Sequence, residues 1–271
     1  MKIRVGLYAM LLLGAAVLAL PFYYMLITSI KTNGEVASAT FSFVAKAPTL
    51  QPYSDLIDAG LILRATGNSA WVAGLLTLGN ILLCPLAGYA FAKHRFPAKD
   101  VLFVVLLSTI MVPSAVLLVP SFLLFRDFGW LDTWTPLVIP GLAGAFGVFL
   151  SRQFIEKIPD SLLESARVEG VSEFGIFCKI VFPLSKSLIA TLGIMTFLGS
   201  WNSFMSPLVI LLDEKKYTLP LVIAMLQGRF PGKENIQMAG AVISILPVML
   251  LFAIFQRQIV ESLAGTGSKE D

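Results

Sequence analysis

Charged residues are scarce in this sequence, and they are missing altogether from its long apolar stretches. Lys, Arg, Asp and Glu make up 14% of the 271 residues, whereas 56% are hydrophobic. Soluble domains carry about 25% charged residues, so this composition excludes an ordinary water-soluble domain. Six stretches contain no Asp, Glu, Lys, Arg or His, namely residues 5–30, 68–92, 101–125, 134–150, 187–212 and 236–255. A transmembrane helix needs about 20 apolar residues, so we expect an all-α polytopic membrane protein with six transmembrane helices.

The missing charges also exclude several functions. Ion-coupled transporters and proton pumps use ionisable groups inside the membrane, and an enzyme buried in the bilayer needs an acid or a base there. No GxxxxGK[ST] phosphate-binding loop is present, so the chain does not bind ATP in that manner. Energy for uphill transport must therefore come from another subunit.

Metal-ligand and nucleic-acid signals are lacking as well. Cys84 and Cys178 lie far apart in the sequence, and the single histidine, His94, stands between Lys93 and Arg95. This arrangement indicates a solvated residue at the end of a span rather than a metal ligand. No basic cluster with interleaved aromatic residues stands outside the apolar stretches. We expect no cofactor, no metal and no nucleic acid to be bound by this chain.

The placement of Lys and Arg predicts the orientation of the spans. With the N-terminus in the cytoplasm, the cytoplasmic side holds twelve of these residues and the opposite side eight, and the short loop 93–100 carries three of them. Basic residues favour the cytoplasmic side, so both termini and the polar segment 159–183, called here the polar insert, are expected in the cytoplasm. The first apolar stretch is too long for a signal peptide and is interpreted as a retained span.

Proline and small residues mark the interior of the spans. Proline removes a backbone hydrogen bond and kinks a helix, and it occurs here at Pro85, Pro113, Pro120, Pro136, Pro140, Pro207 and Pro247. Small residues gather at 141–147, where they allow helices to approach closely. We expect bent helices in a tightly packed bundle, which by itself names no function.

The polar insert is predicted to form two short helices. Ser161 and Glu164 have the spacing of a capping box that starts a helix, and Gly170 suits the left-handed residue that ends one. Ser172 suits the cap of a second helix, which Pro183 is expected to close. Such a segment suits a surface that docks into a soluble partner, or an amphipathic segment lying on lipid.

The spacing within the polar insert resembles the EAA motif, EAA-x3-G-x9-I-x-L-P, of the permease subunits of ABC importers. The matching positions are Glu164, Ser165, Ala166, Gly170, Ile180 and Pro183. Ser165 replaces the second alanine and Phe182 replaces the leucine, and both changes are mild because Ser is small and Phe is apolar.

Other stretches are similar to the maltose-permease-like subunits of carbohydrate importers, over roughly residues 68–263. They include residues 88–93, 95–97, 200–202, 217–220 and 246–247. The resemblance implies a type I ABC importer permease fold in the inner (plasma) membrane. It divides the chain into a first span with its extracellular loop at 1–67, a permease domain at 68–260 and a cytoplasmic tail at 261–271.

The same resemblance implies the partners. This chain would form a heterodimer with a second permease subunit, two ATPase subunits would bind ATP and Mg, and a solute-binding protein would deliver a carbohydrate. The polar insert would be the coupling helix that fits a cleft in the ATPase. Glu164, Ala166 and Gly170 occupy its defining positions, with Gly170 as the bend. Glu164 has two interpretations, a helix cap alone or a contact with the ATPase as well.

Two further regions carry weaker expectations. The resemblance implies that the extracellular loop 213–235 reaches into the cleft of the binding protein, although a plain connector is the alternative. Asn202, Ser203 and Ser206 are polar residues of the fifth span and are candidates for contacts with sugar hydroxyls. Hydrogen bonds between helices are the commoner use of such residues, and the second permease is an alternative source of the substrate contacts.

A carbohydrate permease has three alternatives. Glycerol-3-phosphate or another polyol as the substrate is compatible with the resemblance. An ATP-independent channel or facilitator would have no use for an EAA-like insert, which argues against it. An enzyme embedded in the membrane lacks an acid or base within the spans.

Overall fold

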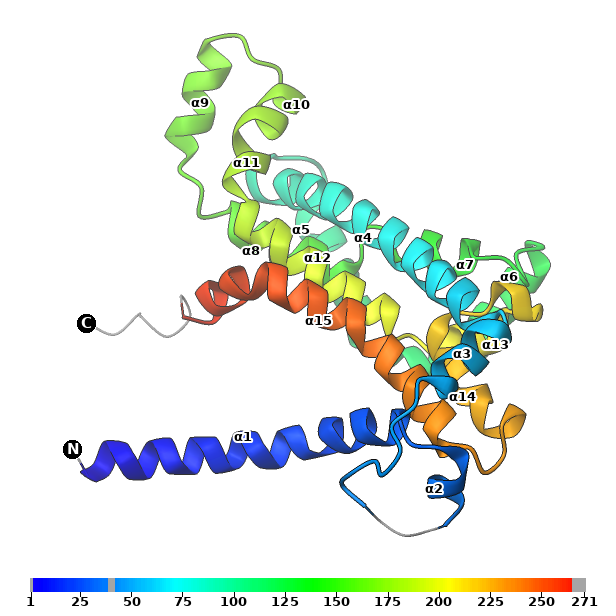
Figure 1. Cartoon of the computed structure of the whole chain (residues 1–271). Helices are drawn as coiled ribbons and strands as arrows, with labels where there is room; N and C mark the ends of the chain where they lie inside the picture. The colour runs from blue at the N-terminus through cyan, green and yellow to red at the C-terminus, as the bar shows by residue number, and fades with distance from the viewer. Residues whose placement is uncertain (1, 39–41, 265–271) are drawn as a thin grey trace. The chain divides into compact units, whose positions relative to one another are not determined.

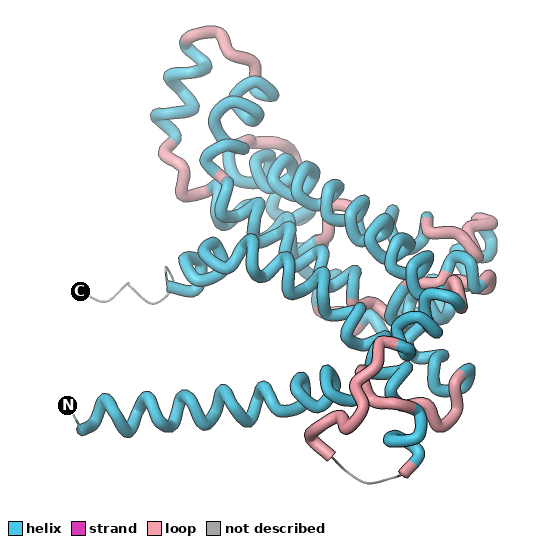
Figure 2. Tube along the Cα trace, viewed as in Figure 1, coloured by secondary structure: helices cyan, strands magenta, loops and turns pink. Residues whose placement is uncertain are grey.

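The computed structural model describes residues 2–38 and 42–264, and all the regular secondary structure in those residues is helical (Figures 1 and 2). The prediction of an all-α protein is confirmed. The longer helices are α1 (Lys2–Ser29), α4 (Leu61–Lys93), α5 (Lys99–Ile110), α6 (Ser114–Asp127), α8 (Ala145–Ile155), α12 (Lys186–Trp201), α14 (Leu219–Arg229) and α15 (Glu234–Ala264). The shorter ones are α2 (Asn33–Ala37), α3 (Gln51–Asp58), α7 (Thr135–Val138), α9 (Asp160–Val168), α10 (Glu173–Ile176), α11 (Phe182–Leu184) and α13 (Met205–Ile210).

Six apolar spans are present when each bent helix pair counts as one. Four stretches are long and apolar enough to cross a membrane alone, namely Gly6–Ser29, Leu61–Lys93, Thr135–Ile155 and Glu234–Gln256. Two pairs pass the same criteria together, Lys99–Ile110 with Ser114–Asp127, bent by 101°, and Glu173–Leu184 with Lys186–Trp201, bent by 79°. Five of the six predicted stretches therefore coincide with spans, one of them sharply bent, whereas the stretch 187–212 overlaps only the second helix of the other bent pair.

The break between α5 and α6 follows from one proline. Pro113 precedes α6 with φ −61° and ψ 130°, an extended conformation. A proline disfavours the helical conformation of the residue before it, so Val112 cannot continue α5. Pro85, Pro120 and Pro247 remain inside α4, α6 and α15. Thus only one of these prolines ends a helix, which the sequence alone did not distinguish.

The predicted fifth span, 187–212, is not one helix. Helix α12 ends at Trp201, and the separate helix α13 begins at Met205 with Pro207 in its first turn. In a continuous helix the ring of Pro207 would clash with the carbonyl of Ser203, four residues earlier. The expectation of a single span over these residues was wrong for this reason.

The chain forms two compact units, and the divisions fall inside α4 and α15. One unit holds the described residues up to 66 together with 218–249, and the other holds 67–217 and 250–264. Within the first unit, the Nδ2 atom of Asn235 donates hydrogen bonds to the Lys31 carbonyl at 2.9 Å and to Asn33 Oδ1 at 3.0 Å. Ser29 Oγ and the Tyr53 hydroxyl lie 2.7 Å apart.

In the second unit, α4 and α8 approach closely through small residues. A Cβ atom added to Gly147 would lie 2.6 Å from Cys84 Sγ, and one added to Gly88 would collide with Ser151. Cys84 and Val148 are buried at this contact with Leu192 of α12. The small residues allow close backbone approach, as predicted for 141–147.

Asn80 of α4 completes the hydrogen bonding of an irregular span. The stretch Thr135–Ile155 loses helical geometry around residues 141–144. There the Nδ2 atom of Asn80 donates to the Gly141 carbonyl at 2.8 Å, and its Oδ1 atom accepts from the Gly144 amide at 3.1 Å. Asn80 is 5% exposed. Broken helices within a membrane require such substitute partners, so one side chain makes the break tolerable.

Candidate functional site

The first helix of the polar insert starts without a side-chain cap. Helix α9 spans Asp160–Val168, and Pro159 takes the cap position with no side-chain hydrogen bond. Ser161 lies inside the first turn, so the predicted capping box of Ser161 with Glu164 is wrong. The extended conformation of Pro159 suits the start of a helix. Asp160 adds a negative charge at the helix N-terminus, where the helix dipole favours it. Glu164 is exposed, so its carboxylate faces solvent.

Gly170 forms the bend as predicted, with a φ of +80°. The Gly170 amide donates to the Arg167 carbonyl at 3.0 Å, and the Val171 amide donates to the Ala166 carbonyl at 3.0 Å. This pair of bonds is a Schellman motif, which ends helices at a left-handed glycine. A Cβ atom at Gly170 would meet nothing within 4 Å. The constraint at this position is therefore the backbone angle and not the space around it.

The second helix of the polar insert is longer than predicted. Ser172 caps it, accepting a hydrogen bond from the Gly175 amide at 3.2 Å, as expected. The helix continues through α10, a π-helical turn at Phe177–Val181 and α11. Pro183 lies within α11, so the expectation that it closes the helix was wrong. The Phe182 amide donates to the Phe177 carbonyl, five residues earlier, which is the hydrogen bond of a π-helical turn. This turn lies directly before Pro183, which has no N–H to donate.

An apolar cluster joins the polar insert to the ends of α4 and α8, beyond which α9 and α10 extend (Figure 1). Its buried members are Tyr89, Ile155, Ile158, Leu163, Ala166, Ile176, Phe177 and Val181. Leu163 is 1% exposed and Ile176 is completely buried. Because the inner apolar side of the insert is covered by protein, it is not available to lie in a lipid surface. This packing argues against the interfacial alternative.

Polar contacts fix the polar insert to the end of α4 at two points. At the first, Lys93 Nζ lies 2.7 Å from Asp160 Oδ1 and donates to the Ile158 carbonyl at 2.6 Å. The hydrogen bond from Lys93, together with its charge, lowers the pKa of Asp160 below its usual value. The start of α9 is thereby held against α4.

The second point is a set of four residues, Tyr89, His94, Arg167 and Glu173, called here the Glu173 cluster. Glu173 accepts hydrogen bonds from Arg167 Nε at 2.6 Å and from the Tyr89 hydroxyl at 2.8 Å. His94 Nε2 lies 3.4 Å from the same carboxylate. Glu173 thus links both helices of the insert to α4. Sequence reasoning missed this cluster, because its members lie far apart in the chain.

The motif residues divide between the interior and the surface of the polar insert. Ala166 and Ile180 belong to the apolar cluster, whereas Glu164 and Pro183 are exposed. The hydroxyl of Ser165 donates only to the Leu162 carbonyl of its own helix, at 3.0 Å. The structure therefore does not bring the motif side chains together at one point.

Exposed apolar side chains flank the glycine bend. Val168 is 89% exposed and Phe174 is 67% exposed. Leu162 on α9 is also exposed, whereas its neighbour Leu163 is buried. Exposed apolar groups next to Glu164 form a mixed surface of the kind that protein partners bind.

The candidate pore residues are not gathered in one cavity. Asn202 is exposed, and its Nδ2 atom donates to the Leu198 carbonyl at 2.9 Å. Ser203 lies in the link between α12 and α13. Ser206 alone lines a described cavity, of about 200 Å³, together with Ser114 and Ser121.

The segment 213–235 is more ordered than a plain loop. It contains a 3-10 turn at Glu214–Lys216 and the helix α14. Leu219, Leu221 and Leu226 of α14 are buried, and Pro220 stands in its first turn, where a proline is tolerated. The expectation of an irregular loop overlooked this helix.

Comparison with known proteins identifies the family. Residues 85–264 match the family described as "Binding-protein-dependent transport system inner membrane component". The arabinooligosaccharides transport system permease protein AraQ of Halalkalibacterium halodurans is 31% identical over 94% of this chain and 92% of its own length. The sn-glycerol-3-phosphate transport system permease protein UgpE of Escherichia coli is 31% identical over 96% and 95%, respectively.

A solved structure shows the same fold. It is described as a bacterial ABC transporter involved in the import of the acidic polysaccharide alginate. The chain it contains matches with a TM-score of 0.82 and 24% identity over 94% of this chain and 96% of its own length. The protein belongs to the family of inner-membrane components of binding-protein-dependent transport systems.

Proposed function

We propose that this chain is a permease subunit of an ATP-driven importer, and that it translocates a carbohydrate delivered by a solute-binding protein. The observation that carries the proposal is the polar insert, a bent helix pair fixed to α4 and presenting Glu164, Val168 and Phe174 outward. A self-sufficient channel has no use for such a surface. The family match supports dependence on a binding protein.

The polar insert is proposed to be the coupling element. Its six motif positions, Glu164, Ser165, Ala166, Gly170, Ile180 and Pro183, shape a docking surface for an ATPase subunit. Ala166 and Ile180 hold the two helices together, and Gly170 allows the bend. Glu164 is free of the capping role, which favours its use as a contact with the ATPase. In this assembly two ATPases bind ATP and Mg, and a second permease completes a heterodimer around the pore.

The proposed orientation places the polar insert and both termini in the cytoplasm. Lys93 and Lys99 belong to the basic loop that supports this assignment. The permease domain is proposed to cover residues 68–260, with the first span before it and a tail after it. The segment 213–235 then lies on the opposite side, where it is proposed to contact the binding protein.

Glycerol-3-phosphate is the second candidate substrate, because one relative is a permease for that compound. A carbohydrate is preferred because another relative of equal identity is a permease for arabinooligosaccharides and because two cavities of this chain carry no net charge.

Site-specific cross-linking tests the proposal. Cys178 is exposed and Cys84 is buried, so Cys178→Ser provides a background without a reactive surface thiol. In this background, Val168→Cys is expected to cross-link to a co-expressed ATPase subunit. The matched control is Arg126→Cys, an exposed position in the last turn of α6, outside the polar insert. Equal cross-linking at both positions, or uptake that continues without ATP, would overturn the coupling role.

A further inference from the structure

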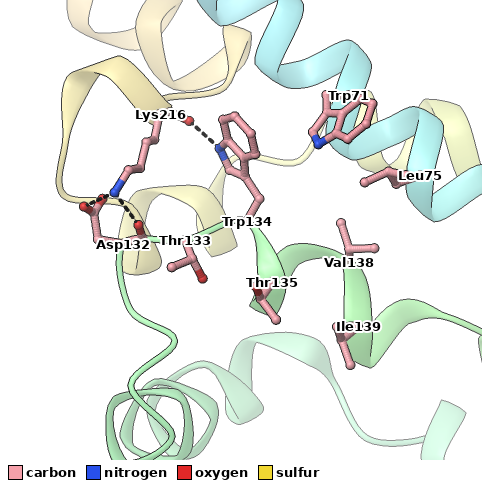
Figure 3. A pocket seen from close by; sticks show the side chains of 9 residues that line it. All are labelled: Trp71, Leu75, Asp132, Thr133, Trp134, Thr135, Val138, Ile139 and Lys216. Atoms are coloured by element: carbon pink, nitrogen blue, oxygen red, sulfur yellow. Dashed lines mark hydrogen bonds and ion pairs between the residues drawn. The ribbon is translucent and has the colours of Figure 1, made fainter.

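A second site lies at the other end of the unit that carries the polar insert. It is a cavity of about 450 Å³, called here the tryptophan pocket, lined by Trp71 and Leu75 of α4, Asp132, Trp134, Thr135 and Lys216, among others (Figure 3). Ligand pockets in proteins typically measure about 300–1,000 Å³ and combine aromatic walls with a few polar groups. The tryptophan pocket has both properties.

The walls of the tryptophan pocket are fixed before any ligand arrives. Trp134 Nε1 donates to the Lys216 carbonyl at 3.0 Å, which holds that indole in place (Figure 3). Asp132 Oδ1 accepts hydrogen bonds from the amides of Leu212 and Asp213, at 3.0 and 2.9 Å. Since these bonds join segments distant in sequence, the pocket has a defined shape, which reduces the entropy lost when a ligand binds.

The tryptophan pocket has no net charge. Lys216 Nζ lies 2.6 Å from Asp132 Oδ2 and also donates to the Asp132 carbonyl at 2.7 Å. The hydrogen bond from Lys216, with those of the two amides, lowers the pKa of Asp132 to about 2, so the carboxylate is ionised at neutral pH. The two charges cancel, and no other lining residue is ionisable. An anionic ligand therefore gains no net attraction from the pocket.

Polar groups that face the tryptophan pocket retain unused hydrogen-bonding capacity. The indole N–H of Trp71 and the hydroxyl of Thr135 make no hydrogen bond within the described part of the chain, and Trp71 is 56% exposed. In Figure 3 the nitrogen of Trp71 lies on the side of its ring nearer Trp134. An apolar ring face with polar groups at its edge matches a sugar ring, which has an apolar C–H face and a rim of hydroxyls.

A neighbouring cavity has the same character. The cavity of about 200 Å³ is lined by Ser114, Ser121 and Ser206 together with Phe122 and Phe125, and it contains no ionisable residue. None of the three serine hydroxyls is bonded within the described residues, whereas Ser108 and Thr109 of α5 donate to carbonyls of their own helix. These two cavities thus offer hydroxyls and aromatic rings without net charge.

We propose that the tryptophan pocket is a subsite for a neutral saccharide, in which a sugar ring stacks on Trp71 and its hydroxyls bond to Trp71, Thr135 and Lys216. This inference rests on the proposed function as an importer permease and narrows its substrate class, because a phosphate ester or a uronic acid polymer is disfavoured. Lipid acyl chains and apolar side chains of a partner subunit are the competing occupants.

Binding and uptake are measured with the assembled importer in lipid nanodiscs and proteoliposomes. The probes are a panel of neutral pentose and hexose oligosaccharides, with sn-glycerol-3-phosphate as the anionic probe. Uptake with the binding protein and ATP identifies the transported compound and tests the proposed function alone. Binding is then followed by tryptophan fluorescence without binding protein or ATP.

Trp71→Ala is expected to weaken saccharide binding to the importer about tenfold. Trp71→Phe, which keeps a ring and loses the N–H, should be intermediate and guards against misfolding of the alanine variant. Trp130→Phe is the matched control, because Trp130 packs on Phe125 and Phe128 outside the pocket, and its binding should be unchanged. Saccharide uptake that proceeds equally in Trp71→Ala would overturn the subsite while leaving the permease function intact.

Charge variants test the preference for neutral ligands. Asp132→Asn leaves Lys216 unpaired and is expected to increase binding of sn-glycerol-3-phosphate several-fold. The double variant Asp132→Asn, Lys216→Met restores neutrality and should lose that gain. Transport of sn-glycerol-3-phosphate by the unaltered importer, with none of the neutral saccharides, would overturn the inference. If brominated lipid quenches the fluorescence of Trp71 and added saccharide does not relieve the quenching, the pocket is a lipid site and the inference is overturned.

Discussion

The two ends of α4 within one unit are held in different ways. At the Lys93 end, the polar insert is attached by side-chain pairs whose acids are well exposed, 71% for Asp160 and 46% for Glu173. At the Trp71 end, contacts run mainly to the backbone, since Asn68 Nδ2 donates to the carbonyls of Lys215 and Tyr217, both at 2.9 Å. Exposed ion pairs contribute only about 0.2–1 kcal/mol. The ion pairs of the insert therefore add little to the apolar cluster beneath them, whereas the walls of the tryptophan pocket depend on hydrogen bonds to the backbone.

The largest expected effect comes from the bend of the polar insert. Gly170→Val forces a β-branched residue to a φ of +80°, and left-handed geometry costs such residues about 1–2 kcal/mol or more. We expect uptake to fall about tenfold or more while the protein remains in the membrane, as measured by radiolabelled transport and membrane immunoblots. Gly170→Asn, which tolerates this angle better, should retain more activity. Full uptake in Gly170→Val would contradict a coupling role for the bend.

A smaller effect is expected from the Glu173 cluster. Glu173→Gln removes the charge that Arg167 and Tyr89 contact but leaves the apolar cluster beneath it. Uptake should fall about threefold, as expected for loss of a partly exposed charged pair, while the partner ATPase still hydrolyses ATP. The loss of coupling is measured as the ratio of substrate transported to ATP hydrolysed. Glu169→Gln, an exposed acid in the same insert, should leave the ratio unchanged.

The stability of the Trp71 end of the unit should depend on Asp132 and on pH. The pKa of Asp132 is lowered from 3.8 to about 2, so its stabilising contribution is complete above about pH 4 and is lost as pH falls towards 2. Asp132→Asn should lower the melting temperature by about 2–4 °C at pH 7 and by much less near pH 2. Thermal unfolding of the purified protein at both pH values tests this. A constant difference across the range would show that the carboxylate charge is not responsible.

The smallest effect is expected at Ser165, where the family motif has alanine. Its hydroxyl bonds only to its own helix, so Ser165→Ala should change uptake by less than about twofold, because surface substitutions of this kind stay within about 0.5 kcal/mol. A tenfold loss would indicate that the hydroxyl contacts a partner. Uptake assays alongside Gly170→Val provide the scale for this comparison.

Local sequence signals predicted the spans and the outline of the polar insert well. Five of the six apolar stretches coincide with spans, and Gly170 and Ser172 take their expected backbone and capping roles. These features depend on neighbouring residues, which a single sequence displays. The prediction of a cap at Ser161 was wrong because Pro159, two residues earlier, takes the cap position.

Features that depend on distant residues were not predictable in this way. Tyr89 and Glu173, or Asp132 and Lys216, meet only because the fold brings their segments together. Likewise Asn80 reveals its role only once the irregular backbone at Gly141 and Gly144 is seen beside it. The sequence likewise does not distinguish the prolines near the helical breaks, Pro113 and Pro207, from those that remain inside long helices, such as Pro85.

One feature of α4 has a mechanical consequence. The helix is continuous from Trp71 to Lys93, a rise of about 33 Å at 1.5 Å per residue. A helix that tilts as one body transmits a displacement at one end to the other end. Pro85 is the point where this helix bends most easily, because proline removes a backbone hydrogen bond there. A tilt imposed on the Lys93 end would move Trp71 relative to the fixed indole of Trp134. Movement driven by the proposed ATPase and the shape of the proposed saccharide subsite would then be coupled through this one helix.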